Sequence, residues 1–222
     1  MFKQIWDTVR HTSSRSIYLL VSLVILVFIY PFVAESRIAT KAVGFLFAVT
    51  PLAGVYAIAD NRRIMIAATV LAIPAFLAIV WHFFVGYNVA NDEYVLILVV
   101  VYYVFTTIGI IRNIFRRDEV NADTIITAIS AYLMIGLCFA VSFMLVESVH
   151  PGSLAMGTAD GLAGWADIFY FSYVTLTTLG YGDIAPVARQ ARSLATLEAI
   201  CGAMYMSILI ARLVSDYQHS KR

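Results

Sequence analysis

Six long apolar stretches constrain the fold of this chain more than any other feature. They cover residues 17–33, 42–59, 64–81, 94–111, 124–146 and 194–213, and Glu198 and Arg212 interrupt the last one. About 20 helical residues cross the hydrocarbon core of a bilayer. Of the 222 residues 61% are hydrophobic and only 13% charged, which is too little charge to coat a soluble globule. The sequence therefore predicts an all-α integral membrane protein with six transmembrane helices.

The composition also excludes several classes of function. A net charge of +1 provides no basic face, so we expect no nucleic-acid partner. Cys138 and Cys201 lie inside apolar stretches, where a small buried hydrophobic side chain is expected rather than a disulfide or a metal ligand. The sequence contains no recognisable catalytic triad, metal cluster or phosphate-binding loop. We predict that the chain is not an enzyme.

Lysine and arginine predict the orientation of the spans. With six spans and the N-terminus inside, eleven of these 15 residues lie on the inner side and four on the outer side. Because cytoplasmic loops are enriched in Lys and Arg, we expect a multi-pass protein of the cell membrane with both termini in the cytoplasm. We also expect the first stretch to be retained, since it is longer than the apolar region of a usual signal peptide.

A shorter apolar segment, residues 165–178, lies between the fifth and sixth stretches. It is too short to span a membrane and runs into the sequence TLTTLGYGD, residues 175–183. Non-helical backbone at membrane depth must be buried in protein or line a water-filled cavity. We therefore expect a re-entrant pore helix followed by a loop that opens to the outer face.

The two glycines of this loop indicate a function for its backbone. Consecutive carbonyl groups can point to one side and replace the hydration shell of an ion if residues alternate between ordinary and positive φ. Gly180 and Gly182 adopt positive φ without the steric cost of a Cβ. A tight glycine turn in an external loop is the other interpretation, but it does not explain why the motif sits between a short apolar segment and the last span.

TLTTLGYGD resembles the selectivity filter of potassium channels. The resemblance covers residues 121–216 and includes Pro186 after the motif, Arg192 before the last helix, and the segment ILIARLVS, residues 208–215. This part of the chain is similar to the pore half of small bacterial potassium channels. Over the first four stretches the resemblance is one of topology alone.

The resemblance implies a homotetramer, because a single filter strand cannot enclose an ion. Four strands would meet around the pore, and their backbone carbonyls, with the hydroxyl of Thr178, would bind K⁺. The filter residues of each strand would be Thr178, Leu179, Gly180, Tyr181 and Gly182, and the K⁺-binding carbonyls would be those of the first four.

Further expectations follow from the same resemblance. Asp183 would lie at the outer mouth, and Gly202 would act as the gating hinge of the inner helix. Potassium would be the permeant ion, no cofactor would be needed, and membrane lipids would surround the assembly. The negative end of the pore helix would point toward the central cavity and favour a cation there.

Some residues depart from the pattern of the family. Where many members carry two tryptophans that brace the filter, this chain has Tyr170 and Phe171. Tyr170 retains a hydroxyl, whereas Phe171 cannot donate a hydrogen bond. We expect both, with Thr177, to support the filter. Leu179 replaces the usual valine, and Val174 stands where some members have a buried carboxylate.

The fourth stretch, residues 94–111, lacks the arginines of a voltage sensor. A charge must lie within the membrane field to do electrical work, about 2.3 kcal/mol per charge per 100 mV. Arg112, Arg116 and Arg117 come only at its inner end, where they act as anchors. We predict at most weak voltage dependence. Since few residues follow Arg212, we expect no ligand-binding domain after it.

These expectations divide the chain into four parts. A cytoplasmic N-terminal segment (1–16) precedes a four-helix transmembrane domain without voltage-sensor arginines (17–117). A pore domain (118–216) contributes the outer helix, the pore helix, the filter and the inner helix, and a short cytoplasmic tail (217–222) follows. Asn121 is expected to cap the outer helix.

Charged residues near the pore are further candidates. Glu198 is an intramembrane carboxylate and a candidate modulatory site, which we expect to pair either with a pore-helix hydroxyl behind the filter or with Arg192. Glu147, Asp160 and Asp167 would make the outer mouth mildly acidic and attract cations, unless they are simply solvated surface charges.

Three other functions stay open. A weakly selective cation channel would share this architecture, since some such channels keep the GYG motif, and reversal potentials in mixed ions separate the two. A secondary transporter predicts inverted repeats and broken helices in both halves, whereas the glycine-rich interruption occurs only in the second half. A non-conducting regulatory subunit would pass no current alone.

Overall fold

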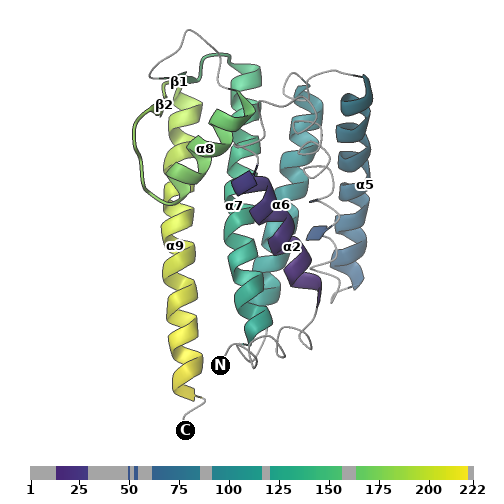
Figure 1. The fold of residues 1–222 in the computed structure, drawn as a ribbon, viewed down its shortest axis with the longest axis vertical. Helices are drawn as coiled ribbons and strands as arrows, with labels where there is room; N and C mark the ends of the chain where they lie inside the picture. Colours follow the sequence, from purple (N-terminus) through teal and green to yellow (C-terminus); the bar gives the residue numbers. More distant parts are fainter. Residues whose placement is uncertain are drawn as a thin grey trace.

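The computed structural model describes residues 14–29, 50, 53–54, 62–85, 92–116, 121–156 and 164–219. Helices α5, α6, α7 and α9 run roughly along the long axis, and α2 crosses obliquely in front of α7 and α6 (Figure 1). The elements in chain order are α2 (Ser14–Val24), the π-helical η1 (Ile25–Ile29), α5 (Arg62–Val85), α6 (Glu93–Arg116), α7 (Ala122–Val149), β1 (Leu154–Met156), α8 (Trp165–Leu176), β2 (Ile184–Pro186) and α9 (Arg189–His219).

Three of the predicted spans correspond to helices that are long and apolar enough to cross a membrane. These helices are α6, α7 and α9. Shorter apolar helices cover residues Ser16–Phe28 and Met65–Trp81, within the first and third predicted spans. The second predicted span, 42–59, lies outside the described residues except for positions 50, 53 and 54. The prediction of a largely helical membrane protein is confirmed, and the count of six spans stays a prediction.

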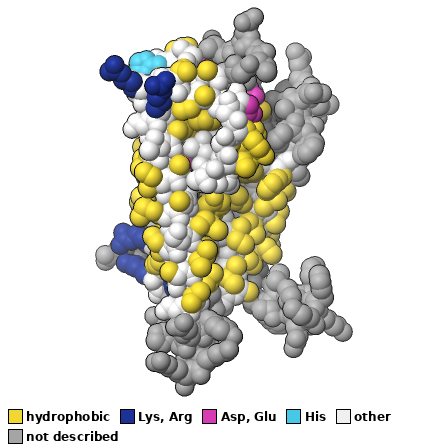
Figure 2. Space-filling view, turned by 90° about the vertical axis from the view of Figure 1, so that its left-hand side faces the viewer, with side chains coloured by type: hydrophobic (Ala, Val, Ile, Leu, Met, Phe, Trp, Pro, Cys, Tyr) yellow, Lys and Arg dark blue, Asp and Glu magenta, His cyan; other side chains and the backbone are white. Residues whose placement is uncertain are grey.

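The distribution of charge on the surface agrees with a membrane environment. Figure 2 shows the face that carries α9, on which Lys and Arg side chains gather toward the two ends. Hydrophobic and uncharged side chains cover most of the region between them. Such an apolar middle zone is stable only where water is absent or where another protein surface covers it.

Helix α7 begins at a cap that its sequence encodes. Asn121 Oδ1 accepts a hydrogen bond from the Thr124 backbone N–H at 2.9 Å, and the Thr124 hydroxyl lies 3.5 Å from the Asn121 backbone nitrogen. This reciprocal capping box satisfies two N–H groups that a helix start leaves without partners. The predicted role of Asn121 is confirmed.

Helix α7 is the centre of the fold. It packs against α2, α6, α8 and α9, and most of its length is buried. Helix α6 contributes Tyr102 and Tyr103, which are fully buried with their rings edge to face at 5.3 Å. Only residues 117–120 separate α6 from the cap of α7, so the first half of the chain is attached directly to the outer helix.

A short two-stranded ribbon lies at the end of the fold that carries α8. β1 pairs antiparallel with β2, with Leu154 opposite Pro186 and Met156 opposite Ile184. Because β1 follows α7 and β2 follows the glycine-rich loop, the ribbon ties the end of that loop to the outer helix. In Figure 1 it lies above α8, which occupies the space between the upper parts of α7 and α9.

Candidate functional site

The loop after α8 has the alternating backbone that its glycines predicted. Gly180 and Gly182 have φ values of 57° and 80°, and Thr178 has a φ of 58°, whereas Leu179 and Tyr181 between them do not have positive φ. Every second residue is therefore left-handed. This alternation turns successive carbonyl groups of a strand toward the same side.

The sequence did not predict the positive φ of Thr178. It is the one non-glycine residue with positive φ among the described residues. A β-branched residue in this conformation carries strain of about 1–3 kcal/mol. The Thr178 hydroxyl donates to the Thr177 carbonyl at 2.7 Å, and the Thr177 hydroxyl donates to the Tyr173 carbonyl at 2.7 Å. These two hydroxyls bond to the backbone at the strained start of the loop, and the role of Thr177 as a filter support stays a prediction.

The N–H groups of the loop point back to the end of α8. The Thr178 N–H donates to the Thr175 carbonyl at 2.9 Å, and the Leu179 N–H donates to the Val174 carbonyl at 2.9 Å. The Gly180 N–H makes a longer bond to the same Val174 oxygen, at 3.4 Å. The loop N–H groups therefore pair with carbonyls in the last turn of α8, which a helix end would otherwise leave without partners.

The carbonyl groups of the loop, in contrast, have no protein partner in the described parts of the chain. None of the hydrogen bonds there ends on the carbonyl oxygens of residues 178–181. These oxygens are ligands of the kind that alkali cations prefer. The loop runs outside α9, away from α7 and α6 (Figure 1). The Leu179 and Tyr181 side chains are 53% and 67% exposed in a single chain.

Two side chains fix the outer end of the loop. The Tyr170 hydroxyl of α8 donates to Asp183 Oδ2 at 2.8 Å, and the Ile184 N–H donates to Asp183 Oδ1 at 3.1 Å. The hydrogen bond to Asp183 raises the pKa of the Tyr170 phenol, which keeps the hydroxyl a donor. Tyr170 therefore binds Asp183 at the end of the motif, and its role as a filter support stays a prediction.

Phe171 occupies a different place from its neighbour. Its side chain is buried, and its ring packs edge to face on Phe143 of α7 with the centroids 4.9 Å apart. This contact holds α8 against the outer helix and makes no use of a hydrogen-bond donor. The support that Phe171 gives to the loop is thus indirect, through the position of α8.

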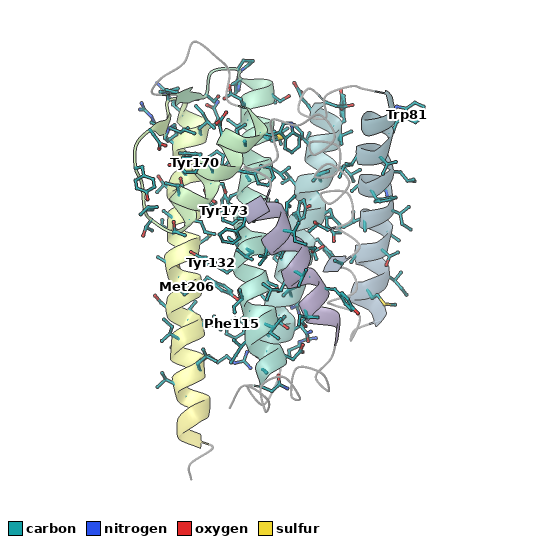
Figure 3. The ribbon with its side chains drawn as sticks, in the orientation of Figure 1. Trp81, Phe115, Tyr132, Tyr170, Tyr173 and Met206 are labelled. Carbon is teal, nitrogen blue, oxygen red and sulfur yellow. The ribbon has the colours of Figure 1, made fainter. Side chains whose placement is uncertain are left out.

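A tyrosine of α8 and a glycine of α7 hold these two helices in close contact. The Tyr173 hydroxyl donates to the Leu133 carbonyl at 2.8 Å. A Cβ at Gly136 would lie 2.5 Å from Cε1 of Tyr173, so only glycine leaves room for this ring. Figure 3 shows Tyr173 directed from α8 toward α7, with Tyr132 below it between α7 and α9.

Gly202 lies where α9 crosses the end of α8. It is buried within a continuous helix, and a Cβ there would collide with the backbone carbonyl of Leu176. The sequence predicted a hinge at this position. The structure gives the glycine a packing role, because it allows the inner helix to approach the base of the loop, and the hinge itself stays a prediction.

Glu198 lies one turn before Gly202 on the same helix. Of its two expected partners, the pore-helix hydroxyl is present, since Ser172 Oγ lies 2.6 Å from Glu198 Oε1. Arg192 instead donates from Nε to the Pro186 carbonyl at 3.1 Å and so braces the segment after the loop.

Glu147 is not a solvated surface charge, and its effect on the charge of the outer mouth stays a prediction. Its side chain is only 8% exposed. Its carboxylate accepts hydrogen bonds from the Gly152 N–H at 2.7 Å and the Leu154 N–H at 3.2 Å. It organises the turn between α7 and β1. Asp167 accepts from the Gly164 N–H at 3.0 Å at the start of α8, and Asp160 lies outside the described residues.

Comparison with known proteins identifies the part of the chain that carries this site. Residues 122–219 match the family described as ion channel. That part of the chain is similar to ion channels. The match begins at the first residue of α7 and ends at the last residue of α9, so it contains the loop and all the contacts that hold it.

Several relatives are potassium channels. The chain is 33% identical over 98 residues to the inward rectifier potassium channel Kirbac3.1 of Paramagnetospirillum magnetotacticum, covering 42% of this chain and 29% of that protein. It is 29% identical over 105 residues to protein LctB of Bacillus caldotenax, covering 46% and 78%. It is 34% identical over 103 residues to two-pore potassium channel 1 of Arabidopsis thaliana, covering 46% and 25%. No solved structure matches the chain.

The chain covers only part of the length of the potassium channels that it matches. This chain spans about a quarter to a third of the length of the two named potassium channels. The resemblance to potassium channels over the second half is confirmed, and the relatives are ion channels rather than enzymes. Nothing in the family suggests a cofactor.

Proposed function

We propose that the chain is one subunit of a homotetrameric potassium channel, in which residues 178–182 form the selectivity filter. The observation that carries this proposal is the row of carbonyls left without partners by a backbone of alternating φ. Oxygens in such a row replace the water around a dehydrated K⁺ ion. Ions move down their electrochemical gradient, with no covalent chemistry.

The need for four copies follows from the exposure of the filter. One strand presents its carbonyls to one side only and cannot surround an ion. Leu179 and Tyr181, more than half exposed in one chain, would be covered by the neighbouring subunits. Helix α9 supports the same assembly, because only 17% of its apolar window is buried within the chain. Four inner helices would then line the conduction path below the filter.

In this proposal, opening of the channel depends at most weakly on voltage. Helix α6 carries Glu93 in its first turn and then no charged residue until Arg112, near its inner end. A segment without charge in the membrane field does no electrical work when it moves. Both termini would lie in the cytoplasm, and the filter would open to the outer side.

The test is ion flux through purified protein in planar bilayers. With unequal mixtures of potassium and sodium on the two sides, we expect a reversal potential close to the equilibrium potential of potassium. Tyr181→Asp should shift it toward zero, whereas Tyr94→Asp, the same change at an exposed position at the start of α6, should not. A parent reversal potential near zero would indicate a weakly selective cation channel.

Two other outcomes would overturn the proposal. Saturating flux coupled to a second ion would indicate a transporter, and the absence of current from a correctly assembled protein would indicate a regulatory subunit. The oligomeric state, measured by native mass spectrometry in detergent, gives an independent check, because the proposal requires four chains.

A further inference from the structure

Glu198 is a buried carboxyl group in the middle of the pore domain. Its side chain has 0% exposure, in a single chain and without any neighbouring subunit. Oε1 lies 2.6 Å from Ser172 Oγ of α8, and Oε2 has no hydrogen-bond partner among the described residues. Ionisation of a carboxyl group in this position would be unfavourable, because a buried charge without a partner costs free energy.

The hydrogen bonds around Ser172 indicate the protonation state of Glu198. Ser172 Oγ is 2.8 Å from the carbonyl oxygen of Gly136 in α7 as well as 2.6 Å from Glu198 Oε1. A carbonyl can only accept, and a serine hydroxyl carries one proton. If Ser172 donates to Gly136, the proton between Ser172 and Glu198 must come from the carboxyl group. Both short contacts are hydrogen bonds only when Glu198 is a neutral acid.

Among the described residues, the Ser172 hydroxyl is the one side-chain donor that could stabilise the ionised form of Glu198. The titratable groups that face Glu198 are Tyr132 and Cys138 of α7, Tyr173 of α8 and Cys201 of α9. None of them is a cation. In the described part of the chain no Lys, Arg or His forms an ion pair with this carboxyl group. An ionised Glu198 would leave a carboxylate oxygen buried and unpaired.

We propose that Glu198 is a positioning residue of the pore, and that its proton joins α9, α8 and α7 through Ser172. This proposal rests on the proposed function and adds a regulatory property to it. The neutral acid donates to Ser172, and Ser172 donates to Gly136. Loss of the proton at alkaline pH removes one of the two bonds and places a charge behind the pore helix.

The geometry connects this proton to the filter. Ser172 lies two residues before Val174 in α8. The Val174 carbonyl accepts hydrogen bonds from the N–H groups of Leu179 and Gly180. Gly202, one turn beyond Glu198, lies against the Leu176 carbonyl at the end of the same helix. A shift of α8 relative to α9 therefore moves the anchor of the filter strand. Conduction falls when the proton is lost.

The test compares the pH dependence of single-channel open probability for three proteins. The open probability of the parent should fall about tenfold as the pH rises from neutral to alkaline, because a buried hydrogen bond is broken. Glu198→Gln should conduct like the parent at neutral pH and show no alkaline decline, since an amide nitrogen donates to Ser172 at every pH. Glu93→Gln, at an exposed position on α6, should keep the parent profile.

The conservative variant separates a positioning role from a merely structural one. An alkaline decline that persists in Glu198→Gln would overturn the proposal, as would a Glu198→Gln channel with strongly reduced open probability at neutral pH. Ser172→Ala, which removes the relay while leaving the carboxyl group in place, should conduct less at all pH values. A Ser172→Ala channel that behaves like the parent would also contradict the proposal.

A second measurement does not depend on conduction. Infrared difference spectra of the purified protein should show the C=O band of a protonated carboxylic acid at neutral pH that is missing from Glu198→Gln. If the protein conducts no ions but shows this band, the proposed function fails and the assignment of the proton stands. If the protein conducts and the band is absent, the inference about Glu198 fails alone.

Discussion

The Tyr170 hydroxyl and the Asp183 carboxylate join the two ends of the pore loop with a hydrogen bond of 2.8 Å. Tyr170 belongs to α8, before the filter strand, and Asp183 follows the strand directly. The second carboxylate oxygen of Asp183 is held by the Ile184 N–H. The strand is thus fixed at its outer end by a bond that bridges 13 residues of sequence.

Removal of this hydroxyl should destabilise the conducting form of the filter. In Tyr170→Phe the ring remains and Asp183 loses its side-chain donor, so we expect open channels to close severalfold faster during sustained activity. Single-channel recording of open times measures this. Tyr94→Phe provides the same chemical change at an exposed position in the first turn of α6. Open times equal to those of the parent would show that the bond does not hold the filter.

Gly202→Ala tests the packing role of the glycine. The added methyl group meets the Leu176 backbone carbonyl, and overpacking of this kind costs about 1–3 kcal/mol. We expect a lower melting temperature of the purified assembly together with reduced current. Leu176→Ala in the same background should not rescue it, because the obstructing atom belongs to the backbone. Ala203→Ser adds one atom at the exposed neighbouring position and serves as the control.

Gly202→Ala also separates packing from hinge motion. If the glycine acts only as a hinge, the variant should keep the melting temperature of the parent and change the open probability alone. Unchanged melting would therefore contradict the packing role.

Arg212 connects the inner helix to the first half of the chain. Its Nη1 donates to the Ile114 carbonyl, near the end of α6, and its guanidinium lies 5.2 Å from the centre of the Phe115 ring. A cation at a helix C-terminus contributes about 0.3–1 kcal/mol. Arg212→Gln should loosen the inner end of α9, which a broader distribution of spin-label distances between α6 and α9 would reveal. Arg189→Gln, at the opposite end of α9, should leave the distribution unchanged.

Glu147 should control the order of the outer turn. In Glu147→Gln an amide group replaces one of the two acceptor oxygens, and an N–H of Gly152 or Leu154 then loses its partner. The expected cost is about 1–3 kcal/mol. Faster hydrogen exchange of these two amides, measured by NMR or mass spectrometry, would show it. Glu93→Gln, at an exposed position on α6, should leave their exchange unchanged.

The sequence predicted those features that depend on local chemistry. Glycine tolerates positive φ, so the conformations of Gly180 and Gly182 followed from their identity. Asn121 was recognisable as a cap for the same reason. Thr178 was missed because its positive φ is imposed by the surrounding hydrogen bonds and is unfavourable for threonine itself.

Contacts that form only in the folded chain were harder to predict, although the pairing of Glu198 with a pore-helix hydroxyl was expected. The burial of Glu147 was not predicted, because a lone carboxylate resembles a solvated charge and only the turn after α7 places two backbone N–H groups around it. Ser172 and Gly136 carry no distinctive signal in an apolar segment, although both are small residues that allow close approach of helices.

The short connection between α6 and α7 has a consequence for assembly. Five peptide units join Arg116 to Asn121, and a chain of that length reaches at most about 18 Å. The first half of each polypeptide therefore stays beside its own outer helix. The extensive contact between α6 and α7 is therefore made within one polypeptide, and it does not depend on the arrival of a second copy.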